Sequence, residues 1–400
     1  MAIFKEIPPT AGLPLHGQDL ASLFKPGSLE EDLRRYLDVP YARVTCSGTA
    51  AFYFILETLK GLSDKKTVVL PSFVCPLVPL AVLRAGLKVE LCDTLPDRFD
   101  LEPLQLQGLG ARRDILAIVA VHLAGVPVDM APVVKAASAC GAFVVEDCAQ
   151  ALGAVHQGRK AGTHGDFSFF SFCRGKGLTL YEGGAAVARQ EGHARALART
   201  IERLQRPDPC AEAVKVLELL GYWIFYRPLL FWFVFKLPER YWLRRGDRVR
   251  AFGEMFAADF PTHRVSWLRQ AVGHASFGRL DEGIARQRET AAEYFKGLRK
   301  VPGLRGLMEH PGDTAVYPYV TVVFDSPGAR DKALDRLDRL GRGASIIYVH
   351  ALPDYDYLRT AVTGASAAHG RHLAVSTLTL STSGFLSTTD REAVLAELKG

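Results

Sequence analysis

The feature that most constrains the fold is an alternation of short apolar runs and helix-like stretches between about residues 43 and 190. The runs include Thr67–Leu70, Ile115–Val121 and Phe143–Val145. Continuous apolar runs of this length are typical of strands buried on both faces of a parallel sheet, joined by crossover helices. The sequence therefore predicts an α/β sheet covered on both faces, with ligands bound beyond the carboxyl ends of its strands.

The last third of the chain has a different pattern. Residues 267–300 show apolar positions at helical spacing without proline, so we expect one long helix near a domain junction. Val316–Phe324 and Leu373–Leu380 alternate like strands, whereas Ala329–Leu340 and Asp390–Leu398 have helical periodicity. The 400-residue chain is thus expected to form a large domain, residues 1–265, and a small α+β domain, residues 266–400.

Composition excludes several classes of protein. The net charge of +6 comes without a dense block of basic residues interleaved with aromatics, so nucleic acid is not an expected partner. The seven cysteines are scattered without CxxC spacing, which argues against a disulfide framework and a metal site and favours a reducing cytoplasm. The start of the chain, MAIFKEIPPTAGLPLHG, is not typical of a signal peptide.

Three segments could carry chemistry, and each also has an ordinary structural reading. SFCRGKGLTLYEGG places Lys176 in a glycine-rich turn after a strand, where a buried amine could form a Schiff base, although such lysines are more often solvated. FVVEDCAQALGA places Asp147 at a strand end. Its carboxylate could hold a protonated ring nitrogen there, or it could equally be a structural cap of the strand. VTCSGTAAFYFIL runs from Ser47 into a helix whose start could bind phosphate or simply be capped.

Taken together, the order and spacing of these segments resemble those of one family. The matching stretches are CSGTAAF, VVLPSFVCPLVPLAVLRAGLKVELCD, VHLAGVPVDM, VVEDCAQALGA, GRKAGTHGDFSFFSFCRGKGLTLYEGGAAV, LDEGIARQRETAAEYF, YVHALPDY and LSTSGFLSTTDREAV. The chain resembles the DegT/StrS-type aminotransferases, which depend on pyridoxal phosphate (PLP) and are best known for aminating nucleotide-linked keto-sugars. The resemblance implies PLP fold-type I: a large domain with a mostly parallel sheet of the seven-stranded type flanked by helices, a small C-terminal α+β domain, and a homodimer.

The resemblance also implies roles for individual residues. Lys176 would carry PLP as a Schiff base, and Asp147 would hold the pyridine nitrogen protonated so that the ring can act as an electron sink. Gln150 would donate a hydrogen bond to the phenolic oxygen of the cofactor. The matching phosphate-binding residues are Thr49, Ala50 and Ser171.

Two positions depart from the family pattern. Cys75 stands where the family commonly has an aromatic ring that stacks on the cofactor, so stacking is lost there. Thr262, in PTHRVS, stands where the family usually has an asparagine that reaches the phosphate of the dimer partner, and its hydroxyl can still donate; Arg264 keeps its place. Some members with histidine in place of the lysine are sugar dehydratases, and Lys176 argues against that activity.

An apolar insertion at about residues 208–250 contains a stretch that is far more apolar and aromatic than the linker that the family usually has at this point. Within it, residues 216–237 read VLELLGYWIFYRPLLFWFVFKL. A simple transmembrane helix is disfavoured because Arg227 and Pro228 lie at its centre, where a charge costs roughly 2.5–3.5 kcal/mol and proline breaks the helix. Two interpretations stay open: a kinked segment in one leaflet of a membrane, helped by the arginines at 240–250, or part of a dimer interface.

The sequence therefore predicts a cytoplasmic PLP-dependent aminotransferase. It would move an amino group from glutamate or a similar donor to a keto substrate, either a keto-sugar or a related, lipid-linked compound. The alternatives are a PLP-dependent lyase or dehydratase acting on a non-sugar substrate, and a catalytically silent PLP-fold scaffold at the membrane. Contact with the inner face of the membrane is an open alternative for residues 216–237.

Overall fold

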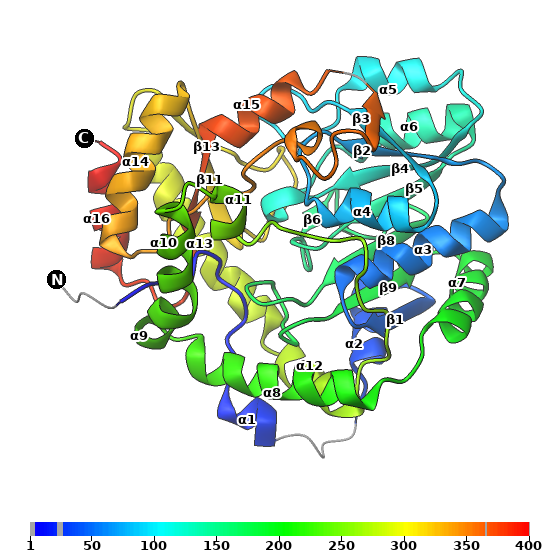
Figure 1. Ribbon diagram of the computed structural model, residues 1–400, viewed down its shortest axis with the longest axis horizontal. Coiled ribbons are helices and arrows are strands. Elements are labelled where there is room, and N and C mark those ends of the chain that lie inside the picture. The colour runs from blue at the N-terminus through cyan, green and yellow to red at the C-terminus, as the bar shows by residue number, and fades with distance from the viewer. Residues whose placement is uncertain (1–4, 22–26, 365, 400) are drawn as a thin grey trace.

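The computed structural model of the chain describes residues 5–21, 27–364 and 366–399. Its centre is an eight-stranded sheet in the order β1-β9-β8-β5-β4-β2-β3-β12 (Figure 1). The neighbouring strands from β8 to β12 are parallel, while β9 runs antiparallel to both β8 and β1. The strands are β1 (Tyr41–Thr45), β2 (Thr67–Pro71), β3 (Lys88–Cys92), β4 (Ile115–Val121), β5 (Phe143–Asp147), β8 (Phe167–Ser171), β9 (Gly184–Ala188) and β12 (Val362–Gly364).

The expected apolar runs form the central strands. Every residue of β4 is buried, and β5 pairs with it in parallel register, Ala117 opposite Phe143. This confirms the covered α/β sheet. Successive side chains of a strand point to opposite faces, and both sets are buried only where helices cover both faces of the sheet. The covering helices are α3 (Gly48–Leu62), α4 (Leu77–Arg84), α5 (Pro103–Leu109), α6 (Met130–Cys140) and α7 (Glu191–Leu204). The sheet exceeds the seven-stranded type by the short edge strand β12.

The C-terminal part forms a three-stranded antiparallel sheet with helices packed on it. It contains α12 (Trp267–Phe277), α13 (Leu280–Leu298), β10 (Leu304–Gly306), β11 (Tyr319–Phe324), α14 (Pro327–Leu340), α15 (Ala368–Ser376), β13 (Thr377–Ser381) and α16 (Thr388–Glu397). The helices expected at Ala329–Leu340 and Asp390–Leu398 are confirmed. The division into domains at residue 265 stays a prediction, since β12 returns to the large sheet.

Two expected elements in this part are wrong. The single helix over residues 267–300 is broken after Gly278, because Arg279 leaves helical geometry and its guanidinium donates to Pro14 O (3.1 Å) and pairs with Asp19. The strand expected at Leu373–Leu380 is helical up to Ser376. The amide groups of His369 and Gly370 at the start of α15 donate to the buried Asp93 carboxylate, a long-range contact that overrides the local alternation.

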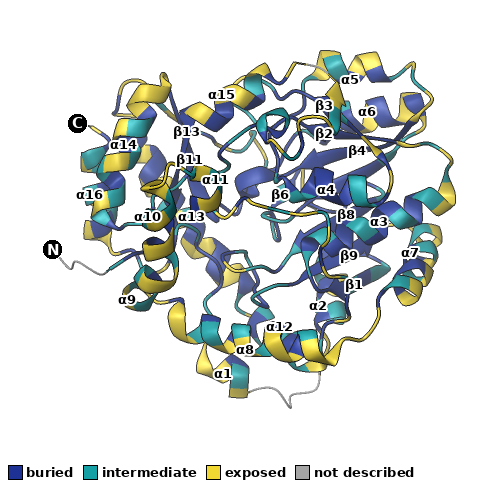
Figure 2. Cartoon of the chain, viewed as in Figure 1, coloured by how far each residue is buried: buried dark blue, intermediate teal, exposed yellow. Residues whose placement is uncertain are grey.

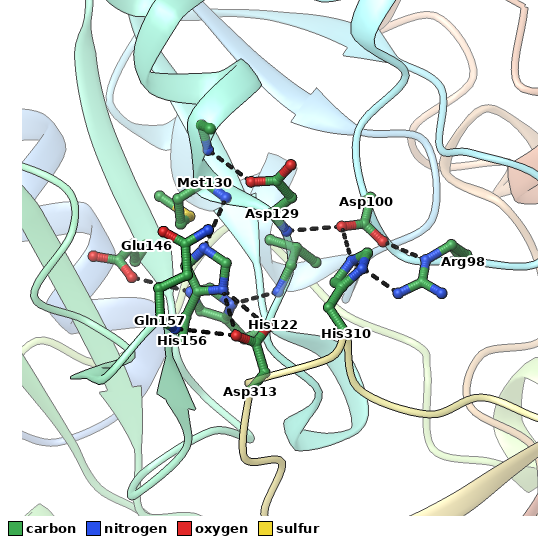
Figure 3. Close-up of polar contacts among 12 residues, drawn as sticks. Arg98, Asp100, His122, Asp129, Met130, Glu146, His156, Gln157, His310 and Asp313 are labelled. Atoms are coloured by element: carbon green, nitrogen blue, oxygen red, sulfur yellow. Dashed lines mark hydrogen bonds and ion pairs between the residues drawn. The ribbon is translucent and has the colours of Figure 1, made fainter.

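Polar contacts tie the C-terminal part to the large sheet (Figure 3). His310 Nε2 lies 2.8 Å from Asp100 Oδ1, and His156 Nδ1 lies 2.9 Å from Asp313 Oδ2. Asp100 also accepts from the Asp129 amide at the start of α6 (2.7 Å). These contacts fix the segment that leads into β11 against the ends of the parallel strands.

The apolar insertion is helical and bent. It comprises α8 (Pro209–Phe225), α9 (Pro228–Phe231), a π-helical turn η2 (Trp232–Lys236), α10 (Leu237–Leu243) and α11 (Arg248–Ala251). The first helix, α8, ends at Phe225, and Pro228 begins α9, so proline interrupts the apolar segment as the sequence predicts. No single helix among the described residues is long and apolar enough to cross a bilayer; α8 and the following stretch Pro228–Leu243 would reach that length together but are bent by 113°.

Candidate active site

The start of α3 lies beside Ser171 and Gly184, where β8 ends and β9 begins. The first amides of a helix have no intrahelical acceptor, and Ser47 satisfies one of them, since its Oγ accepts from the Ala50 amide at 3.0 Å. The amides of Gly48 and Thr49 therefore stay available to an anion. A Cβ on Gly184 would lie 2.5 Å from the Gly48 nitrogen, so only glycine permits this close approach. Thr49 and Ser171 line the cavity next to the start of α3, so their hydroxyls add two donors.

Asp147 is the last residue of β5 and lies at the floor of the same cavity. Burial raises the pKa of its carboxyl from 3.8 to about 6, while the Ala149 amide, which donates to Oδ1 (2.9 Å), and the positive charge of Lys176 act in the opposite direction. Because burial outweighs the contacts that stabilise the charged form, a ligand with a positive charge, such as a protonated ring nitrogen, would stabilise this carboxylate.

Gln150 is oriented by two donors. Its Oε1 accepts from the Ala124 amide and from Tyr319 Oη, both at 2.7 Å. Because both partners donate, the oxygen of the amide is identified, and the nitrogen Nε2 is left to donate into the cavity. This is the orientation that the predicted hydrogen bond to a phenolic oxygen requires.

Lys176 follows Gly175 in the turn between β8 and β9. Gly175 has a φ of +76°, a conformation that glycine adopts without strain, and the N-terminal segment passes close by at Gly12. Lys176 is half-buried and lines the cavity with Asp147 and Gln150. Cys75 lines the same cavity, so the side chains of Lys176, Asp147 and Cys75 border one space.

Beneath the cavity lies a buried cluster that sequence analysis did not find. Ligand-type atoms of His122, Glu146 and Cys148 lie within 4.8 Å of one another. The ring of His122 is nevertheless committed on both sides, since Nδ1 accepts from the Val128 amide (3.2 Å) and Nε2 lies 3.0 Å from Glu146 Oε2. Glu146 accepts three further amide hydrogens, from Gly162, His164 and Gly165. The cluster is therefore a hydrogen-bond network that holds His122, a cavity-lining residue, in place.

The start of α3, His122, Asp147, Gln150, Ser171 and Lys176 all line one cavity of about 420 Å³. A model of the DegT/DnrJ/EryC1/StrS aminotransferase family matches residues 23–207 and 261–399. The chain belongs to this family. It is therefore an aminotransferase with PLP as its cofactor. The unmatched residues 208–260 are the apolar insertion and the segment that follows it.

Individual relatives agree with this assignment. The aminotransferase is 27% identical to GDP-perosamine synthase of Caulobacter vibrioides, an alignment that covers 92% of this chain and 88% of that protein. Its fold is that of DesI, solved in the presence of its TDP-sugar product (TM-score 0.76, 23% identity, 99% and 92% of the two chains). It is also that of the E. coli GDP-4-keto-6-deoxy-D-mannose-3-dehydratase with bound hydrated PLP (TM-score 0.76, 16% identity, 99% and 100%).

The cavity of the aminotransferase fits PLP. A carboxylate, an amide donor, a lysine and a helix start with hydroxyls converge on one space, as the ring nitrogen, phenolic oxygen, aldehyde and phosphate of PLP require. Of the eight expected site residues, six line the cavity: Thr49, Cys75, Asp147, Gln150, Ser171 and Lys176. Ala50 does not line it, and its amide is used by Ser47. Thr262 does not line it either, although its neighbour Pro261 does.

The wall of the cavity holds aromatic residues that sequence analysis missed. Phe256 and Phe260 come from the segment after the insertion, outside the family match, and Tyr348 comes from the loop before β12. Glu254 fixes this wall, since its carboxylate accepts from the Val349 amide (3.0 Å) and from Tyr355 Oη (2.5 Å). These aromatics add ring surface to a cavity in which position 75 offers a thiol instead of a ring. Burial raises the pKa of the Cys75 thiol to about 12, so the thiol stays neutral.

Proposed function

We propose that this aminotransferase moves an amino group from glutamate or a similar donor to a keto-sugar or a related keto compound. The observation that carries the proposal is the convergence of Lys176, Asp147 and Gln150 with the start of α3 on one cavity. A sugar acceptor is supported by GDP-perosamine synthase, which matches over most of both chains, and by DesI, solved with a TDP-sugar.

We assign each residue one task toward the cofactor. PLP supplies the carrier for the amino group and an electron sink in its ring. Lys176 binds the cofactor through Nζ and, once displaced by the donor, takes and returns at Nζ the proton that moves during transfer. The Asp147 carboxylate holds a proton on the ring nitrogen. Gln150 donates from Nε2 to the phenolic oxygen.

The phosphate is assigned to the start of α3. The first helix amides and the helix dipole favour an anion there, and the hydroxyls of Thr49 and Ser171 lie beside it.

We propose a homodimer in which Thr262 donates its hydroxyl to the phosphate bound by the partner subunit. The half-buried position of Thr262 next to the cavity-lining Pro261 supports this assignment. We place the dimer in the cytoplasm.

Two other functions remain as outcomes of the test. A PLP-dependent lyase or dehydratase acting on a non-sugar substrate is motivated by Cys75 and Thr262, the two departures from the family pattern. A silent scaffold would keep the fold without turnover. The wall formed by Phe256, Phe260 and Tyr348 also leaves room for an acceptor with an apolar, lipid-linked part.

Single-turnover half-reactions distinguish these functions. The PLP form mixed with glutamate is expected to release one equivalent of 2-oxoglutarate, and the resulting amine form should then be reoxidised by one of a set of keto-sugars and keto-lipids. The Lys176→Ala variant serves as the control for release that does not involve the site. PLP that stays bound while no amino donor yields a keto acid would contradict an aminotransferase and favour the alternatives.

A further inference from the structure

The insertion has an inward face that is fully explained by packing. Tyr222, Tyr226 and Phe231 are buried with Leu15 and Val272 in a small apolar cluster separate from the main core. Tyr222 stacks on Tyr226 with ring centroids 4.4 Å apart. The inward face therefore attaches the insertion to α12 and to the N-terminal segment.

The outward face is apolar and exposed. Figure 2 shows exposed residues along α8, α9 and α10, at the lower left of the molecule. We define the docking face as the apolar residues of α8, α9, η2 and α10 that are 37–68% exposed: Val214, Leu217, Leu220, Ile224, Phe225, Leu229, Phe233, Val234, Leu237, Tyr241 and Leu243. Single exposed apolar residues are normal, but eleven within one short segment are typical of an interaction surface.

Of the charged residues between Val214 and Leu243, all but Arg227 make ion pairs within the described parts of the chain. Lys236, the charged residue between Leu229 and Leu237, is only 2% exposed and pairs with Glu239 (3.0 Å) and Asp338. Glu239 is itself buried. The lysine between Leu229 and Leu237 is thus turned inward and neutralised.

Exposed arginines lie within the docking face and directly after it. Arg227 is exposed at the start of α9, and Arg244 and Arg245 are exposed after α10. Within the described parts of the chain, none of the three makes an ion pair. Arg245 lies over the Tyr241 ring, 4.3 Å from its centroid, and Arg250 lies over Trp242 at 5.0 Å. An apolar surface with unpaired arginines and interfacial aromatics has the composition of a segment that lies in the headgroup region of an anionic bilayer.

We propose that the docking face attaches the enzyme peripherally to an anionic lipid bilayer. The charge pattern favours lipid over a second copy of the chain. In a two-fold interface the same patch meets itself, so the unpaired arginines would need acids on the face. The two acids between Val214 and Leu243 are already used, since Glu218 pairs with Lys215 (2.8 Å) and Glu239 with Lys236. The 113° bend between α8 and the following stretch suits a segment lying on the surface better than one crossing it.

Flotation of the PLP-bound enzyme with vesicles tests the proposal. The vesicles contain phosphatidylcholine and phosphatidylglycerol in equal parts, or phosphatidylcholine alone. The face variant combines Leu229→Ser, Val234→Ser and Leu237→Ser, which are 63%, 50% and 50% exposed. A matched control replaces three exposed residues of α3, α5 and α6 in the same way: Leu62, Leu104 and Val134. A charge variant combines Arg244→Gln and Arg245→Gln.

The wild type and the matched control are expected to float with the anionic vesicles, less so at high salt. The face variant should lose at least about tenfold in bound fraction, and the charge variant should bind both kinds of vesicle equally weakly. Wild-type protein that stays at the bottom of the gradient, or a face variant that floats normally, overturns the proposal. So does a face variant that falls from dimer to monomer in analytical ultracentrifugation, because the face is then a protein interface.

The glutamate half-reaction is measured on the same samples. None of the substituted residues lines the active-site cavity, so the half-reaction should be equal in all variants and shows that each is folded. If 2-oxoglutarate is released by none of them while flotation follows the expected pattern, the proposed catalytic function is wrong and the docking face stands.

Discussion

Glu254 offers a quantitative test of the wall that closes the active-site cavity. Its carboxylate is almost fully buried and joins the segment carrying Phe256 to the loop carrying Tyr348, through the Val349 amide and Tyr355 Oη. The Glu254→Gln variant keeps an oxygen that can accept from both donors. The substitution therefore removes the ionisation of the group without removing the contacts.

The magnitude follows from the pKa of this carboxyl. Burial raises it from 4.5 to about 7, against the hydrogen bonds from Tyr355 and Val349. Because the folded pKa lies above the unfolded one, the folded protein binds more protons between the two values, and stability falls as the pH rises. At about 1.4 kcal/mol per pKa unit, ionising Glu254 costs the folded protein about 3 kcal/mol once the pH exceeds the folded pKa.

Equilibrium unfolding in urea at about pH 5 and about pH 8 measures this cost. Between the two values, the wild type should lose about 2–3 kcal/mol more unfolding free energy than Glu254→Gln. Glu6, whose pKa burial also raises to about 7, titrates in the same window but is present in both proteins and cancels. Glu392→Gln, at an exposed site, should follow the wild type. Parallel pH profiles for wild type and Glu254→Gln would refute the reasoning.

Two further substitutions test the cofactor site. Asp147→Asn should keep bound PLP but slow the glutamate half-reaction by about a hundredfold or more, because an amide cannot hold the ring proton; a nearly unchanged rate in stopped-flow absorbance would show that Asp147 has another role. Gly184→Ala should weaken PLP binding by about tenfold or more, since its Cβ would displace the start of α3 from the phosphate. Gly192→Ala, whose Cβ meets nothing within 4 Å, is the control, and equal PLP affinity in the two variants would argue against this phosphate site.

Much of the site could be predicted because its residues sit at local signals. Asp147 ends an apolar run, Ser47 begins a helix after a strand, and Lys176 lies between glycines, so each position follows from the short sequence around it. Parallel strands bring their carboxyl ends to one edge, and that rule places these distant segments together. The family resemblance supplied the chemistry that links them.

What the sequence did not predict depends on contacts between distant residues. The helix break at Arg279 depends on contacts with Pro14 and Asp19, and the start of α15 depends on contacts with Asp93. Local periodicity does not reveal such long-range contacts. The role of Glu254 was missed for the same reason, since its partners lie about a hundred residues further along the chain. The apolar insertion was recognised, but which side chains face outward could be read only from the fold.

The central claim is that Lys176 holds PLP in this cavity. Reduction of the PLP-bound enzyme with borohydride, followed by peptide mapping, tests it most directly, because only an imine between the cofactor and an amine becomes a stable covalent bond under these conditions. We predict loss of the visible cofactor absorbance and a phosphopyridoxyl group on Lys176 alone. A label on another lysine, or no label on a protein that contains bound PLP, would contradict the account.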